Sequence, residues 1–242
     1  MITVKNVSKK FGEKFAVNNI SFSAPTGRIT GLIGSNGAGK STSMRLMCTL
    51  LKPTSGSIMM DNIDVVKSPQ KAREKIGILL GGDITLYDRL TAKENILYFA
   101  DLQGMKRTVS EKRLMELSAL LGMNEYLDRQ VSGFSRGMRQ KIAFAKSIIH
   151  SPDILLLDEP STGLDINSIC DVQNFILHCK KQGKTILLST HNPTEMALCD
   201  NLVFLEQGKV IGQGSKAELL EKTGCKSVSS LFFYFRERTK AK

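Results

Sequence analysis

The segment Gly34-Ser-Asn-Gly-Ala-Gly39-Lys40-Ser41 decides the fold of this chain. It matches the P-loop pattern G-x-x-x-x-G-K-[ST], in which glycines let backbone N–H groups curl around phosphate oxygens. In this pattern Lys40 reaches the terminal phosphates of a nucleotide, and the hydroxyl of Ser41 holds Mg²⁺. The segment therefore predicts a nucleoside-triphosphate site, whereas the alternative is a plain glycine-rich turn.

The residues on both sides of this loop have the pattern that a P-loop requires. Residues 28–33 are typical of a buried strand, and the apolar residues after the loop recur at helical spacing before Pro53. A helix that begins at such a loop adds positive potential at its N-terminus. We expect bound nucleotide to contact Gly34, Ser35, Asn36, Gly37, Ala38, Gly39, Lys40, Ser41 and Thr42.

A second chemical signal is the apolar run Ile154-Leu-Leu-Leu157, which ends in Asp158 and Glu159. The carboxyl end of a parallel strand beside a P-loop faces the bound phosphates. We therefore assign Asp158, together with Ser41, to the metal, and Glu159 to the activation of the attacking water as a general base. Taken alone, two acidic residues after a strand are more often solvated loop residues, but the P-loop reverses that preference.

The alternation of strand and helix patterns predicts an α/β fold. Apolar residues alternate with polar neighbours at Ile2 and Val4 and again at Ile20, Phe22 and Ala24, which favours a small antiparallel sheet at the start. From residue 83 to 152 the pattern is mostly helical, and strand patterns resume at 154–157 and 185–189. We predict one domain over 1–242, with a catalytic core at 1–82 and 153–215, a helical insertion at 83–152 and a tail at 216–242.

Composition excludes several classes of protein. Hydrophobic residues are 41% and charged residues 24% of the chain, unlike disordered, collagen-like or coiled-coil sequences. No apolar run approaches the roughly 18–20 residues that a membrane-spanning helix needs, and no secretory signal is visible, so we expect a cytosolic chain. The net charge of +11 suits nucleic acid, an anionic membrane surface or phosphorylated ligands without choosing among them.

The cysteines and the C-terminal segment have plain structural explanations. The 5 cysteines are odd in number and form no C-x-x-C pair, so we expect free thiols rather than disulfides or a zinc site. Residues 227–242 combine phenylalanines with a basic end. A terminal helix docked on the protein is the preferred interpretation, and an anchor at a membrane surface is the alternative.

Further motifs follow in the order of a known family over nearly the whole chain. Phe134-Ser135-Arg136-Gly137-Met138 resembles the signature sequence of ATP-binding cassette (ABC) transporter subunits, and Ser161-Thr-Gly-Leu-Asp165 resembles their D-loop. His191 resembles their switch histidine, and Phe11 stands where the family has an aromatic residue that stacks on adenine. The resemblance implies a RecA-like P-loop NTPase core, with an N-terminal antiparallel β subdomain and an inserted α-helical subdomain.

The resemblance also implies roles for these residues. Ser135 and Gly137 would bind the γ-phosphate of ATP held by a second subunit, Asp165 would belong to the nucleotide site, and His191 would contact the γ-phosphate with Lys40 and Glu159. Each has an alternative explanation in structure alone. Phe11 could be a core residue, Ser135 a plain helix N-cap, and His191 a turn histidine before a proline.

Two departures from the family pattern stand out. Arg136 and Met138 replace a glycine and a glutamine of the signature. The family usually ends the strand at 76–79 with a glutamine that touches Mg²⁺, whereas this chain has Gly81, Gly82 and Asp83 there. We therefore assign no metal ligand in that segment and leave Asp83 or water as its substitute.

The expected function follows from the resemblance. It implies an ATPase that uses ATP and Mg²⁺, acts as a dimer of cassettes, and couples to a separate membrane-spanning permease subunit at the cytoplasmic face of the cell membrane. The motifs look most like exporter subunits of the sodium-extrusion and drug-efflux type, with no nucleic-acid partner. The alternatives are a soluble cassette ATPase acting on nucleic acid or ribosomes, which the charge favours, and a small-molecule kinase.

Overall fold

A six-stranded sheet holds the P-loop strand near its centre. The structure is a computed structural model that describes residues 1–81 and 85–240, so Gly82 and Asp83 lie outside the described residues. The strand order is β10-β9-β3-β8-β7-β6, parallel throughout except for β10. The strands are β3 (Ile29–Ile33), β6 (Ile76–Leu79), β7 (Ile154–Asp158), β8 (Thr185–Thr190), β9 (Asn201–Glu206) and β10 (Lys209–Ser215).

A second, antiparallel sheet packs beside this core, as the opening of the sequence predicts. Its order is β2-β1-β4-β5, and β1 pairs along its length with β2 and with β4. The strands are β1 (Ile2–Phe11), β2 (Lys14–Ala24), β4 (Ser55–Met60) and β5 (Ile63–Asp64). The α/β fold class predicted from the sequence is therefore the fold that the structure has.

The core sheet is covered on both faces, which explains its continuous apolar strands. Every residue of β8 is buried, as expected for a parallel strand with protein on both sides. Leu187 belongs to the hydrophobic cluster formed with the antiparallel sheet and α1, whereas Leu188 belongs to the cluster formed with the helices of the other face. The side chains of successive residues thus join two separate cores.

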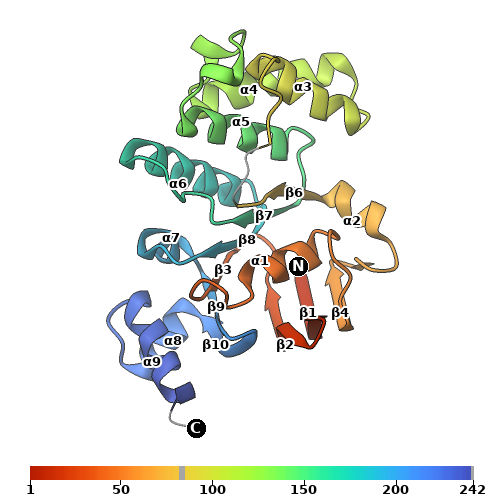
Figure 1. Ribbon diagram of the computed structural model, residues 1–242. Helices are drawn as coiled ribbons and strands as arrows, with labels where there is room; N and C mark the ends of the chain where they lie inside the picture. Colours follow the sequence, from red (N-terminus) through yellow and green to blue (C-terminus); the bar gives the residue numbers. More distant parts are fainter. Residues whose placement is uncertain (82–84, 241–242) are drawn as a thin grey trace.

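Most of the helices lie between β6 and β7 or after β7 in the chain. Figure 1 shows α3, α4 and α5 together at one end of the molecule, beyond the edge of the core sheet. They occupy most of the stretch predicted as a helical insertion, while the domain boundaries themselves stay a prediction. The helices up to β9 are α1 (Lys40–Met47), α2 (Pro69–Lys75), α3 (Ala92–Leu102), α4 (Arg107–Leu121), α5 (Arg136–Ile148), α6 (Ile166–Lys181) and α7 (Pro193–Leu198), with short 3₁₀ turns η1 (Asn124–Tyr126) and η2 (Val131–Gly133).

The chain ends in two helices, α8 (Lys216–Thr223) and α9 (Val228–Lys240), that pack on the core. The rings of Phe232 and Phe235 lie 6.4 and 5.2 Å from the ring of Phe204 in β9, and Leu231 is fully buried. The preferred interpretation of the tail, a docked helix, is confirmed. All 5 cysteines are free, and the described helices include none with the length and apolar character to cross a membrane.

Candidate nucleotide site

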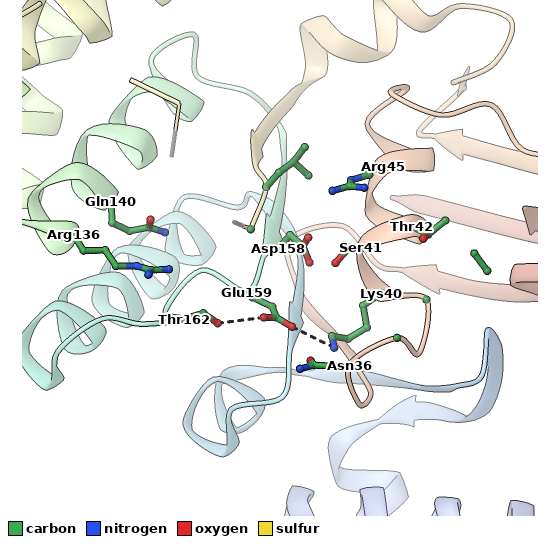
Figure 2. Close-up of a pocket in the computed structure, with 15 residues that line it drawn as sticks. Asn36, Lys40, Ser41, Thr42, Arg45, Arg136, Gln140, Asp158, Glu159 and Thr162 are labelled. Atoms are coloured by element: carbon green, nitrogen blue, oxygen red, sulfur yellow. Dashed lines mark hydrogen bonds and ion pairs between the residues drawn. The ribbon is translucent and has the colours of Figure 1, made fainter. Parts of the chain in front are cut away.

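An open pocket of about 520 Å³ lies where β3 and β7 end, beside the start of α1 (Figure 2). The P-loop and the first turn of α1 form one wall, with Asn36, Gly37, Gly39, Lys40, Ser41 and Thr42. The other lining residues are Ala16, Arg45, Leu80, Gly81, Arg136, Gln140, Asp158, Glu159 and Thr162. Of the loop residues predicted to contact nucleotide, Gly34, Ser35 and Ala38 are not in this lining.

The ammonium of Lys40 is hydrogen-bonded to the backbone of the P-loop itself. Lys40 is 4% exposed, and its ammonium donates hydrogen bonds to the carbonyl oxygens of Gly34 at 2.9 Å and Ser35 at 3.2 Å. Its Nζ also lies 3.3 Å from Glu159 Oε1. A positive charge that is buried requires such partners, and the phosphates of a nucleotide offer better ones.

Asp158 ends β7 inside the pocket. Its side chain is 4% exposed and accepts a hydrogen bond from the hydroxyl of Ser189 on the neighbouring strand β8. Figure 2 shows its carboxylate facing the hydroxyl of Ser41 across the pocket. The two residues that the sequence assigns to a metal ion therefore line the same pocket, although they are 117 positions apart by their numbers (41 and 158).

Glu159 is held by its backbone and by its side chain. Its φ is 48°, a left-handed conformation that is unusual for a residue other than glycine. The backbone N–H donates to the carbonyl oxygen of Ser189 at 3.0 Å, and the carboxylate accepts a bond from Thr162 Oγ1 at 3.3 Å. Burial raises the pKa of Glu159, but the Lys40 ammonium and the contact with His191 lower it by more, so the pKa lies below its ordinary value.

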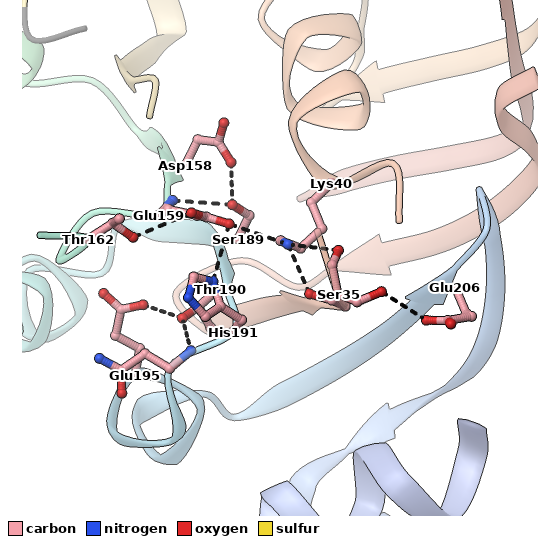
Figure 3. A network of polar contacts seen from close by, with 12 residues as sticks. Ser35, Lys40, Asp158, Glu159, Thr162, Ser189, Thr190, His191, Glu195 and Glu206 are labelled. Atoms are coloured by element: carbon pink, nitrogen blue, oxygen red, sulfur yellow. Dashed lines mark hydrogen bonds and ion pairs between the residues drawn. The ribbon is translucent and has the colours of Figure 1, made fainter. Parts of the chain in front are cut away.

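His191 follows β8 and touches Glu159 rather than the wall of the pocket. Its Nδ1 lies 3.3 Å from Glu159 Oε1, and its side chain is 53% exposed. The histidine thus stands beside the carboxylate that the sequence assigns as general base, in the polar network of Figure 3.

The same network contains Glu195, a buried carboxylate that the sequence analysis missed. Glu195 accepts hydrogen bonds from the backbone N–H of Ser161 at 3.1 Å and from the hydroxyl of Thr190. Burial raises the pKa of Glu195 above its ordinary value, against hydrogen bonds from Ser161 and Thr190 that lower it. The side chain ties the segment after β7 to the segment that carries His191.

The residues of the signature and D-loop segments cap two neighbouring helices. Ser135 Oγ accepts a bond from Met138 N at 3.3 Å at the start of α5, and Asp165 Oδ1 accepts one from Ser168 N at 3.0 Å at the start of α6. The backbone of Gly137 packs against Ser168. Ser135, Gly137 and Asp165 are outside the pocket lining, and their roles toward nucleotide stay predictions.

Arg136 and Gln140 reach the pocket from α5. Gln140 Nε2 donates to the carbonyl oxygen of Pro160 at 2.7 Å, and the Arg136 guanidinium packs over Gly163. The sequence pattern marked Arg136 only as a departure from the signature, placed Gln140 in the Arg139-Gln140-Lys141 segment that follows the signature without a role at the pocket, and gave no indication of Arg45. Helical spacing could have found both, because Arg45 is one turn after Ser41 and Gln140 is one turn after Arg136.

Phe11 lies at the end of β1 and is 50% exposed. The ammonium of Lys9 lies 5.1 Å from the centre of its ring. The exposure argues against the alternative of a core residue and agrees with a ring that could stack on a base. Phe11 does not line the pocket, but Ala16 of the following strand does.

Comparison with known proteins gives a consistent result. Residues 17–162 match the family described as ABC transporter. The "ABC transporter ATP-binding protein NatA" of Bacillus subtilis (strain 168) is 43% identical over 237 residues, which cover 96% of both chains. The "Linearmycin resistance ATP-binding protein LnrL" of the same strain is 32% identical and covers 96% of this chain and 74% of its own.

Solved structures with the same fold are also ATP-binding cassettes. One described as the ATP binding subunit of an ABC transporter has a TM-score of 0.89 and 28% identity, over 98% of this chain and 99% of that one. A dimeric post-hydrolysis state of a cassette bound to ADP and Pi has a TM-score of 0.81 and 26% identity, over 89% and 98%. The chain belongs to the ABC transporter family, as an ATP-binding subunit with the ATPase activity of that family.

Proposed function

We propose that this ATPase subunit is one of two cassettes that close around ATP and thereby drive export through a separate membrane-spanning subunit. The observation that carries the proposal is the position of Ser135 and Gly137, which begin α5 outside the pocket lined by the P-loop of the same chain. A helix start of this kind presents N–H groups to an anion. A two-fold pair would place this helix start of each copy beside the nucleotide held by the other.

Within each site the residues would divide the work between binding and proton transfer. Phosphates entering the pocket compete for the Lys40 ammonium, which now contacts Gly34, Ser35 and Glu159. Once the phosphates have taken Lys40 away from it, Glu159 is placed to accept a proton from the attacking water. His191 would remain beside the Glu159 carboxylate. Phe11 supplies the stacking surface for adenine.

Ser41 and Asp158 fit a magnesium ion. They offer a hydroxyl oxygen and a carboxylate oxygen, the hard donors that Mg²⁺ prefers, and Mg²⁺ is usually held by one or two protein oxygens together with substrate phosphates. Among the described residues no group of three or more His, Cys, Asp or Glu side chains gathers to hold a metal by itself. Bound Mg²⁺ would neutralise charge on the phosphates, and these two residues would hold it in place.

The export part of the proposal is supported by the names of the relatives. One relative is named a linearmycin resistance protein, which favours a drug-like compound as the transported substrate. Sodium is the other candidate, and it rests on the resemblance of the motifs to sodium-extrusion subunits. The chain would then lie at the cytoplasmic face of the cell membrane, bound to its membrane-spanning permease subunit. We expect no nucleic-acid partner.

Replacement of Glu159 by Gln tests the dimer. The variant keeps the size of the side chain but loses the base, so ATP should be bound and not hydrolysed, and the variant should elute as a dimer with MgATP and as a monomer without it. Light scattering after size-exclusion chromatography measures the mass. The matched control, Glu125→Gln, changes an exposed glutamate on η1 and should behave as the wild type. A Glu159→Gln protein that binds ATP and stays monomeric contradicts the dimer.

Isolation of the tagged chain from its own cells in mild detergent tests the partner. A multispanning membrane protein in near-stoichiometric amount is the expected result, and that protein then becomes the object of sodium and drug transport assays. Recovery with ribosomes or nucleic acid, with the chain absent from the membrane fraction, would instead support the soluble alternative.

A further inference from the structure

A short polar chain connects the P-loop to the C-terminal helix. The hydroxyl of Ser35 donates a hydrogen bond to Glu206 Oε2 at 3.2 Å (Figure 3), and Arg236 Nε of α9 lies 3.5 Å from Glu206 Oε1. The Glu206 side chain is 15% exposed. One carboxylate thus touches the nucleotide-binding loop with one oxygen and the C-terminal helix with the other.

The backbone around Glu206 is packed tightly against the P-loop. A side chain at Gly34 would place its Cβ 2.5 Å from the carbonyl oxygen of Leu205, closer than real Cβ atoms come. The N–H of Gly208, in the turn after β9, donates to the carbonyl oxygen of Ala38 at 2.9 Å. The end of β9 therefore forms the back wall of the loop, and a change there reaches the loop directly.

The C-terminal helix is fixed to that same strand. Phe232 and Phe235 pack on Phe204, two residues before Glu206 in β9. Arg236 Nε is buried and has no hydrogen-bond partner among the described residues, so the ion pair with Glu206 is the interaction that compensates its charge there. The position of Arg236 depends in this way on the docking of α9.

The charges have opposite effects on a bound polyphosphate. A carboxylate behind the P-loop repels the phosphates, and a guanidinium next to that carboxylate offsets the repulsion. Glu206 is closer to the loop than Arg236, because Glu206 contacts Ser35 directly and Arg236 acts on the far oxygen of the carboxylate. The opposite charges of Glu206 and Arg236 therefore both contribute to the electrostatic potential at the nucleotide site.

We propose that Glu206 is a positioning residue for the P-loop and that Arg236, from the C-terminal helix, sets the ATP affinity of the loop by compensating Glu206. The docking of α9 and the binding of nucleotide are then coupled, and by reciprocity each stabilises the other. The proposal rests on the nucleotide site at the P-loop and is independent of the dimer, the permease and the transported substrate.

The test is a set of full-length variants whose MgATP dissociation constants are measured by calorimetry. Arg236→Met keeps the apolar stem and removes the charge, and it should raise Kd about 2- to 5-fold, the range of a partly exposed charge pair. Glu206→Gln keeps an acceptor for Ser35 and removes the repulsion, so Kd should fall or stay equal. The double variant should bind ATP at least as tightly as the wild type.

Arg238→Met is the matched control. Arg238 is on the same helix, but it donates to Tyr234 Oη at 2.7 Å, and its guanidinium lies 5.1 Å from the centre of that half-buried ring. Arg238→Met removes one positive charge, as Arg236→Met does, but it should change the Kd for MgATP less than Arg236→Met. The shift caused by Arg236→Met should shrink at high salt, because a charge effect at a partly exposed site is screened.

Several results separate the possible outcomes. The turnover rate at saturating ATP should stay the same in Arg236→Met while KM rises, and the melting temperature shows whether α9 stays docked. The proposal is wrong if the double variant binds as weakly as Arg236→Met, or if Arg238→Met has an equal effect. A wild-type chain that binds no MgATP would instead overturn the nucleotide site itself.

Discussion

Two glutamates in one polar network have pKa shifts of opposite sign. Glu159 lies beside the Lys40 ammonium, which outweighs burial and lowers the pKa of its carboxyl. Glu195 is only 2% exposed, and burial outweighs the hydrogen bonds from Ser161 and Thr190 and the charge effect of His191, so the pKa of its carboxyl is raised. The opposite directions follow from the deeper burial of Glu195 together with the ammonium that only Glu159 has beside it.

The raised pKa of Glu195 predicts a pH dependence of stability. The folded protein holds the Glu195 proton more tightly than the unfolded chain does, so this contribution to stability is complete at low pH and is lost as pH rises through the raised pKa. In Glu195→Gln the contribution is absent. The melting temperature of the wild type relative to this variant should therefore fall as pH rises from about 4 to about 8.

Melting curves at several pH values measure this difference. The control is Glu221→Gln, an exposed glutamate on α8, whose difference from the wild type should stay nearly constant over the same range. A difference between wild type and Glu195→Gln that does not change with pH would show that Glu195 titrates as an ordinary carboxyl.

The two glutamates also show what sequence can reveal of a site. Glu159 was predictable because it directly follows a strand next to a P-loop, so local order along the chain fixes its place. Glu195 stands in Asn192-Pro-Thr-Glu195-Met, which has the composition of an exposed helix start. Its burial depends on Ser161, which is brought beside it only when β7 and β8 pair.

At the scale of elements, the sequence predicts a strand or a helix most reliably where its local pattern is compatible with one structure only. The strand before Gly34 and the helix after Lys40 form as expected, because a phosphate-binding loop requires both. The helix start at Ser135 is also found, with the side chain accepting from Met138 N. In each case the residues that define the element are close together in the chain.

The C-terminal helix shows where local pattern is insufficient. Phenylalanines followed by basic residues suit either docking on protein or contact with a membrane. What decides is Phe204, an apolar partner on a strand that no local pattern connects to the tail. Phe233, on the other side of the same helix, is 59% exposed. The sequence therefore indicates an amphipathic helix, but it does not reveal that β9 covers the apolar face of this helix.

At the scale of the whole molecule, one sheet is shared by two hydrophobic cores. Successive residues of β8 point into different cores, Leu187 toward the antiparallel sheet and Leu188 toward the helices of the other face. Both side chains are fully buried. Because the strand belongs to both layers, we expect the chain to unfold as a single cooperative unit rather than as two layers.

Leu187→Ala and Leu188→Ala form a matched pair that tests this cooperativity. Each substitution leaves a cavity in one core and should lower the free energy of unfolding by about 2–5 kcal/mol. Both should shift the whole of a single transition, followed by circular dichroism and by tyrosine fluorescence during denaturant unfolding. A transition that splits in one variant, with only part of the signal moving, would show that the two layers unfold separately.

The strand order of the core sheet also bears on how the protein is synthesised. β3, which leads into the P-loop, is synthesised early. Its two neighbours in the sheet, β8 (Thr185–Thr190) and β9 (Asn201–Glu206), are synthesised more than 150 residues later. At about 5–20 residues per second, Ile29–Ile33 waits on the order of 10 s or longer for its last neighbour. Throughout that wait the nascent chain carries an apolar strand with both edges open, the kind of segment that aggregates or that chaperones protect.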